Sequence, residues 1–214
     1  MGTRYLTAVY LDGDYKVAQF GLQDGYPRIA GIQVLRFAMS IAGQAERDAF
    51  KEKVKQCRWI TAEEFGAIDK SPQAESWEKK FPELSGSTGA GILNLIQNSE
   101  FGMALEDDLE FAADSLFCEW AWVIDLDKGV LECYQGNNAD TPLTEQDRFY
   151  FLRDQEERGY YGIRLVKAWE LSSLPDERTF LDTFEDARKE RKSVDTVESI
   201  TQHIKKKAER GESR

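Results

Sequence analysis

The chain has 214 residues, of which 41% are hydrophobic and 12% aromatic, enough apolar material for a full core without metal or disulfide support. Its formal net charge of −11 opposes binding to the phosphate backbone of nucleic acids, and no apolar run approaches the roughly 20 residues that cross a bilayer. The single histidine, His203, stands in a charged C-terminal segment, which disfavours Ser-His-Asp and Cys-His catalysis and makes a zinc site uncommon.

The chain opens with a pattern typical of a β-hairpin, over residues 4–22. Apolar side chains stand on both faces of its first strand, which predicts a central strand that is covered on both sides. Asp12-Gly13 marks the turn, because glycine accepts a positive φ without steric cost. The return strand is expected from Tyr15 to Leu22.

Helices are expected between this hairpin and residue 115, where apolar residues recur at helical spacing. Thr61, with Glu64 three residues later, is a capping box, so a short helix is expected to begin there. The other expected helices cover residues 32–41, 45–57, 92–98 and 107–115.

A second hairpin is predicted from residue 120 to residue 134, with its turn at Lys128-Gly129. Every second residue from Trp120 to Leu126 is apolar, and this face is expected to be buried. A further strand is predicted from Gly162 to Leu171, followed by a helix. Because tight turns join the strands and helices separate the strand blocks, the sequence predicts an α+β fold: an antiparallel sheet built from hairpins, with helices packed on it as in a layered sandwich.

One globular domain is expected over residues 1–187, followed by a charged tail over residues 188–214. Lys and Arg outnumber Asp and Glu in the tail, so the body is acidic and the tail mildly basic. Cys57, Cys118 and Cys133 lack CxxC spacing, which indicates reduced core thiols and a cytoplasmic protein. The N-terminus has no signal-peptide pattern, so secretion is not expected.

The N-terminal residues suggest a catalytic mechanism that needs no histidine. N-terminal-nucleophile hydrolases place a Thr, Ser or Cys at the free start of a strand, where the α-amino group acts as the base. Thr3 stands directly before the first expected strand, but Gly2 precedes it, so a cleavage beyond removal of Met1 is required. The simpler interpretation is a small N-terminal segment that begins a strand.

Polar residues and glycines cluster where the second strand ends, from Gln19 to Pro27. Loops at strand ends are frequent binding sites because a rigid sheet holds them. Asp24 is placed to orient a ligand amine and Tyr26 to stack on a ring, although a plain Asp-Gly turn stopped by Pro27 also accounts for the pattern. The residues predicted to bind a ligand are Arg4, Gln19, Gln23, Asp24 and Tyr26.

Four other segments carry weaker signals, and each has a structural explanation. The loop 85–91 could hold an anion before a helix, but it lacks a GKS ending and is explained as a flexible connector. The acidic run 106–110 could bind a divalent cation, although it also complements a helix dipole. Asp125 and Asp127 could form an acid-base pair, but an exposed strand end before a turn is the simpler interpretation. Lys205–Lys207 are too few to indicate nucleic-acid binding.

The N-terminal segment also carries a family resemblance, through Met1–Arg4, Asp12-Gly13, Val17–Gly21 and Asp24–Pro27. These stretches resemble a group of uncharacterised proteins from phages, bacteria and fungi, which open with MGTR and continue with a stretch similar to AQYGQWDGYP. Residues 118–150 resemble the group more loosely. The chain departs from the pattern at Leu22, at Gln23 and at Arg28-Ile29-Ala30. The resemblance implies a shared architecture and is compatible with a phage origin, and it brings no reaction with it.

These observations predict a non-enzymatic binding or interaction protein, host-directed if phage-encoded, that acts as a counter-defence inhibitor or as a small-ligand binder. The alternative is an N-terminal-nucleophile amide hydrolase that uses Thr3, with Asp24 or Arg4 positioning the substrate. A host protein or a small molecule is the expected partner, with no membrane and no nucleic acid. No cofactor and no metal ion are expected, and the sequence does not fix the oligomeric state.

Overall fold

The computed structural model describes residues 2–68, 76–155 and 159–185. The chain divides into two compact units, Met1–Leu174 and Pro175–Arg214. The second unit is described over residues 175–185, where 177–185 form the helix expected after Pro175. The predicted boundary at residue 187, the tail and His203 lie outside the described residues.

The first predicted hairpin is confirmed. Strand β1 (Tyr5–Leu11) pairs antiparallel with β2 (Asp14–Gly21). Both turn residues lie in the left-handed region that a two-residue hairpin loop requires, with φ of 55° at Asp12 and 78° at Gly13. The carboxylate of Asp127 accepts a hydrogen bond from each of these two amides, at 2.9 Å, so the second hairpin helps to fix the turn of the first.

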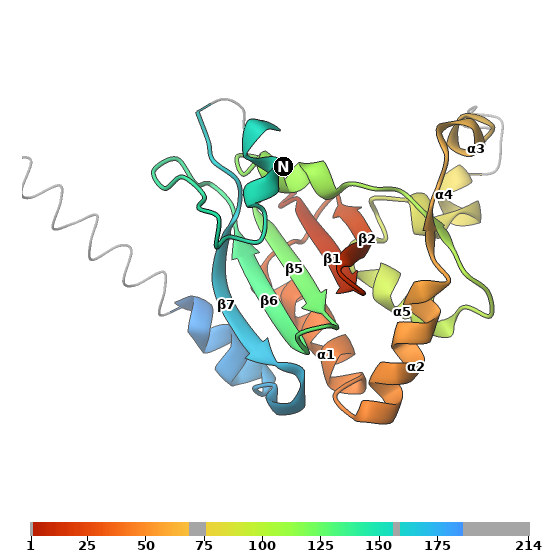
Figure 1. The fold of residues 1–214 in the computed structure, drawn as a ribbon, viewed down its shortest axis with the longest axis horizontal. Coiled ribbons are helices and arrows are strands. Elements are labelled where there is room, and N and C mark those ends of the chain that lie inside the picture. Colours follow the sequence, from red (N-terminus) through yellow and green to blue (C-terminus); the bar gives the residue numbers. More distant parts are fainter. Residues whose placement is uncertain (1, 69–75, 156–158, 186–214) are drawn as a thin grey trace, which may run out of the picture. The chain divides into compact units, whose positions relative to one another are not determined.

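Five strands form a mixed sheet in the order β2-β1-β5-β6-β7 (Figure 1). The second predicted hairpin is confirmed as β5 (Trp120–Asp125) and β6 (Val130–Gln135), and β7 (Arg164–Glu170) pairs antiparallel with β6. The α+β class is therefore confirmed. However, β1 and β5 run parallel, because the helical segment between the hairpins returns the chain to the end of the sheet at which β1 begins.

Short helices occupy the chain between the two hairpins. Thr61 caps α3 as predicted: its hydroxyl accepts a bond from the Glu64 amide at 3.2 Å, and the Glu64 carboxylate accepts one from the Thr61 amide at 3.0 Å. A two-stranded parallel sheet also forms here, from β3 (Arg58–Trp59) and β4 (Ala104–Leu105). The helices are α1 (Ile32–Ser40), α2 (Gln44–Lys55), α3 (Ala62–Gly66), α4 (Trp77–Lys80) and α5 (Ile92–Asn98).

Both faces of the sheet are buried at β1, β5 and β6, as the apolar pattern of the first strand predicts, whereas the edge strand β7 is largely exposed. One face carries Leu6, Val123 and Tyr134 and packs against the segments that contain residues 109–113 and 149–152. The opposite face, with Val9 and Trp122, is covered by α2 and by the turn that leads into α5, which both contact β1 and β2. The sheet is therefore the middle layer of three.

The helix expected over residues 107–115 is instead a short 3-10 helix, Leu109–Ala113. The first residues of the expected helix are paired elsewhere: Asp107 forms a parallel bridge with Ala18 of β2, and the Asp108 amide donates to the Ala18 carbonyl oxygen. Because these backbone groups extend the sheet, they cannot begin a helix.

Among the described residues, every helix is either too short or too polar to reach across a bilayer. The three cysteines are free, with Cys118 and Cys133 buried and Cys57 partly buried. Burial raises the pKa of all three thiols, which keeps them protonated and unreactive near neutral pH.

Candidate functional site

Three segments that are far apart in the sequence meet at the open end of the β1–β2 hairpin: residues 2–5, 19–31 and 85–91. The Gly25 amide donates a hydrogen bond to the Thr3 carbonyl oxygen at 2.9 Å, and the Leu22 amide donates to the Gly86 carbonyl oxygen at 2.9 Å. The sequence singles out each segment separately, and the fold brings all three together.

Gly25 is held tightly between the N-terminal segment and the sheet. A Cβ atom at this position would lie 2.8 Å from the Tyr5 Cβ and 3.0 Å from the Thr3 carbonyl oxygen, too close for a side chain without local movement. The indole N–H of Trp122 donates to the Gly25 carbonyl oxygen at 3.3 Å. Glycine is therefore required here by close approach.

The chain then forms one turn of π-helix, Pro27–Gly31, that leads directly into α1. The Tyr26 carbonyl oxygen accepts bonds from the Ile29 amide at 3.0 Å and from the Gly31 amide at 3.2 Å. Asp24 adopts a φ of 65°, a left-handed conformation that Asp tolerates better than most residues. π-helical turns such as Pro27–Gly31 are rare and occur frequently at functional sites. Backbone hydrogen bonds thus order the segment.

Three large apolar side chains on this ordered segment face solvent: Leu22 is 51% exposed, Tyr26 49% and Ile29 49%. Seven large apolar side chains are exposed across the described residues, and these three fall within eight consecutive positions. Single exposed apolar side chains are ordinary, whereas three of them within one short ordered segment mark a candidate interaction site. Leu22, Tyr26 and Ile29 are called the corner patch below.

Carboxylates line the outer edge of β2, beside the residues that lead into the corner patch. The Asp108 carboxylate accepts a bond from the Phe20 amide at 2.9 Å. The pKa of Asp108 is raised to about 6, mainly by burial and also by the charges of Glu106 and Asp107, while the Phe20 bond acts in the opposite direction. Glu106, Asp107 and Asp108 are called the acidic edge. No three His, Cys, Asp or Glu side chains form a metal site in the part of the chain that the structure describes.

Three of the five predicted ligand residues lie at this corner. Gln23, Asp24 and Tyr26 are consecutive or nearly so, and all three are exposed. The Tyr26 ring is therefore open to solvent, and its stacking on a partner group, with Gln23 and Asp24 as polar contacts, stays a prediction.

The other two predicted ligand residues make contacts within the fold. Gln19 is 2% exposed, and its side-chain amide donates to the Ser85 carbonyl oxygen at 3.0 Å. The Arg4 guanidinium lies over the Phe117 ring, 4.2 Å from the ring centre. The structure does not bring these two side chains to the surface that carries Tyr26.

Thr3 stands immediately before β1 and is 2% exposed. Gly2 packs so closely against Gln23 that a Cβ atom on it would lie 2.8 Å from the Gln23 Cβ. An N-terminal nucleophile needs a free α-amino group, and Gly2 holds the Thr3 nitrogen in a peptide bond. The hydrolase interpretation stays a prediction that depends on a cleavage before Thr3.

The expectation that Asp125 lies at an exposed strand end is wrong. Its side chain is fully buried and forms an ion pair with the guanidinium of Arg148. Arg148 also donates to Glu132 at 2.6 Å, and the Tyr134 hydroxyl donates to the same carboxylate at 2.7 Å. No sequence signal reveals this cluster, because Arg148 stands outside any periodic segment and pairs with strands far from it in sequence.

In comparisons with known proteins, no family model, no curated protein and no solved structure matches the chain. A function therefore has to be argued from the residues themselves.

Proposed function

We propose that this protein is a non-enzymatic binding protein that recognises a partner protein through the corner patch. The observation that carries the proposal is the exposure of Leu22, Tyr26 and Ile29 on a segment ordered by backbone hydrogen bonds. Burying the exposed halves of these side chains against a partner contributes on the order of 1 kcal/mol each. A segment that is already ordered loses little conformational entropy on binding, so more of this energy remains as affinity.

The negative charge of this protein indicates what kind of partner surface would complement it. The acidic edge lies beside the end of β2, the corner patch begins directly after that strand, and the chain as a whole carries a net charge of −11. A partner with an apolar pocket flanked by Lys and Arg side chains complements both features. A nucleic acid does not, because its phosphates meet repulsion.

The family resemblance supports a partner that is particular to this chain. Leu22 and Ile29 occupy positions at which the sequence departs from the similar phage, bacterial and fungal proteins. Both positions are exposed, so these two departures alter the surface of the protein. If the chain is phage-encoded, as the resemblance allows, a host protein is the first partner to test, and inhibition of a host defence is one role that such binding would serve.

The experiment is capture of a partner by the purified chain, followed by titration with that partner in purified form. Tyr26→Ala and Ile29→Ser are expected to weaken binding roughly tenfold each, which corresponds to about 1.4 kcal/mol. Phe151→Ala and Leu165→Ser are the matched controls, because these side chains are 51% and 49% exposed elsewhere on the surface. The controls are expected to bind within about twofold of the wild-type chain.

Ionic strength supplies an independent check on the acidic edge. Binding is expected to weaken as salt rises, because exposed charges are screened beyond roughly 8 Å at physiological ionic strength. Equal losses in the patch variants and the controls, or binding that salt does not change, would contradict the proposed surface.

The alternative, an amide hydrolase that uses Thr3, is decided by the intact mass of the purified chain. A mature chain that begins at Thr3 supports the hydrolase. A chain that begins at Met1 or Gly2 removes it, because the nucleophile then has no free α-amino group.

A further inference from the structure

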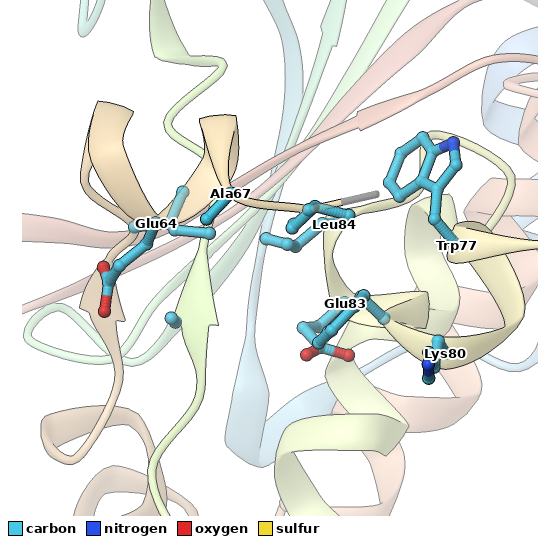
Figure 2. Close-up of a pocket in the computed structure, with 10 residues that line it drawn as sticks. Glu64, Ala67, Trp77, Lys80, Glu83 and Leu84 are labelled. Atoms are coloured by element: carbon cyan, nitrogen blue, oxygen red, sulfur yellow. The ribbon is translucent and has the colours of Figure 1, made fainter. Parts of the chain in front are cut away.

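The loop 85–91 is attached to the rest of the fold at both of its ends. Leu84, which precedes the loop, is 4% exposed, and Figure 2 shows it among the residues that line a pocket between α3 and α4. Near the other end of the loop, the Ala90 amide donates a hydrogen bond to the Tyr5 hydroxyl of β1 at 2.9 Å. Two further bonds join the start of the loop to β2 and to the residue that follows this strand.

These two bonds connect Gln19 with Leu22, the first residue of the corner patch. The Gln19 side-chain amide donates to the Ser85 carbonyl oxygen at 3.0 Å, and the Leu22 amide donates to the carbonyl oxygen of Gly86 at 2.9 Å. A Cβ atom on Gly86 would lie 3.8 Å from the Leu22 Cβ, so the loop runs directly against this side chain. The position of Leu22 therefore depends on where Gln19 holds the loop.

Stability alone does not account for a glutamine at position 19. The side chain is 2% exposed, and its oxygen Oε1 has no hydrogen-bond partner among the described residues, as is also true of the hydroxyl of Thr7, its neighbour in the β1–β2 register. The Ser85 carbonyl oxygen already accepts the Thr88 amide at 3.0 Å, so the bond from Gln19 is an additional one. A buried oxygen without a partner costs free energy that an apolar side chain would not, and such departures are expected at functional sites.

We propose that Gln19 is a positioning residue for the corner patch. Its amide nitrogen holds the loop 85–91 against the end of β2, and the loop holds Leu22 where a partner meets it. Gln19 is buried, so it acts through the loop and does not touch the partner. The inference rests on the proposed function, which assigns partner binding to the corner patch.

The first test needs no partner: hydrogen exchange of the Leu22 amide in the full chain, followed by NMR. Gln19→Met keeps the length of the side chain and removes its amide, so exchange at Leu22 is expected to become about tenfold faster. The melting temperature is expected to stay the same or to rise, because the unpartnered oxygen is removed as well. Gln97→Met is the matched control: Gln97 also buries an unpartnered amide oxygen, but it lies near the end of α5, and exchange at Leu22 should stay within about twofold.

Gln19→Glu separates the hydrogen bond from the packing of the side chain. A protonated carboxyl donates to the Ser85 carbonyl oxygen as the amide does, whereas an ionised carboxylate cannot. Protection of the Leu22 amide is therefore expected to recover as the pH falls from about 8 to about 5, the range in which a buried carboxyl takes up its proton. The comparison is made with the wild-type chain at each pH, because Asp108 bonds the nearby Phe20 amide and titrates in the same range. Protection that does not recover would contradict a role for the bond.

The second test uses the captured partner. Gln19→Met is expected to weaken binding about fivefold, mainly through faster dissociation, and Gln97→Met less than about twofold. Unchanged exchange at Leu22 in Gln19→Met would overturn the inference whatever the partner does. Faster exchange with unchanged binding would overturn it too, provided that Tyr26→Ala weakens binding, and so would a melting temperature lowered by more than about 4 °C. Failure of the proposed function is a separate result, in which Tyr26→Ala keeps full affinity.

Discussion

The guanidinium of Arg148 balances two carboxylates that the sheet holds in its interior. Asp125 and Glu132 reach it from neighbouring strands, and the Arg148 side chain is itself 9% exposed. The guanidinium also lies over the Tyr10 ring, 4.9 Å from its centre. Removing one partner of such a cluster leaves buried charge uncompensated, which costs more than the net contribution of the intact cluster.

Arg148→Met is therefore expected to lower the free energy of unfolding by about 3–5 kcal/mol, measured by urea denaturation. The exposed pair Arg153–Asp154 supplies the control, and Arg153→Met is expected to cost less than about 1 kcal/mol. Adding Asp125→Asn and Glu132→Gln to Arg148→Met should recover part of the loss. If Arg148→Met and Arg153→Met lowered the free energy of unfolding by similar amounts, the Arg148 cluster would contribute no more than a surface ion pair.

Asp108 should make the stability depend on pH. Its pKa is raised in the folded protein from 3.8 to about 6, so the folded state holds this proton more tightly than the unfolded chain does. The stability it contributes is fully present below about pH 4 and is lost as the pH rises through about 6.

Asp108→Asn keeps an oxygen for the Phe20 amide and removes the titration. The variant is expected to melt at a higher temperature than the wild type at pH 7, and the difference should shrink as the pH falls to 4. Asp140→Asn, at an exposed position, is the control and should show no such trend. A wild-type chain and an Asp108→Asn variant whose melting temperatures change in parallel with pH would contradict the raised pKa.

Single residues differ in how far the sequence alone identifies their role. The Asp12-Gly13 turn and the Thr61 cap are local, so their neighbours in sequence are enough to predict them. Tyr26 is predicted as a surface contact from its turn, but Leu22 and Ile29 are not, because one apolar residue in a turn gives no periodic signal. Arg148 is missed because its partners come from strands that only the fold places beside it.

At the scale of elements, the corner between β2 and α1 depends on the absence of a side chain at Gly25. Gly25→Ala is expected to destabilise the protein by about 1–3 kcal/mol and to weaken partner binding, because the new methyl group must displace Tyr5 or Thr3. Thermal unfolding and the partner titration measure the two effects.

Gly66→Ala is the matched control, since its added methyl group meets no atom within 4 Å at the end of α3. Its stability is expected to be unchanged or slightly higher, by up to about 1 kcal/mol, because alanine favours a helix over glycine. If Gly25→Ala were as stable as Gly66→Ala, the contacts around Gly25 would have room for a methyl group, which contradicts the close packing at this position.

The elements that the sequence predicts well are those set by local pattern. Both hairpins follow from strand alternation and turn residues, and α1, α2 and α5 follow from helical spacing. The parallel pairing of β1 with β5 is not visible, because it joins residues more than a hundred positions apart. The helix expected at 107–115 is wrong for a related reason. The Asp108 amide donates its hydrogen bond to Ala18 of β2, so it does not begin a helix.

At the scale of the whole molecule, negative charge and a localised apolar surface act together. In the proposed function, the net charge of −11 disfavours anionic partners, and the corner patch supplies the contact energy for one suitable partner.

Hydroxyl-radical footprinting of the chain with and without its captured partner measures the exposure of these side chains directly. Oxidation of Leu22, Tyr26 and Ile29 is expected to fall in the complex, while that of the equally exposed Phe151 and Leu165 stays the same. Protection of Phe151 or Leu165 with an unchanged corner patch would show that the partner binds elsewhere.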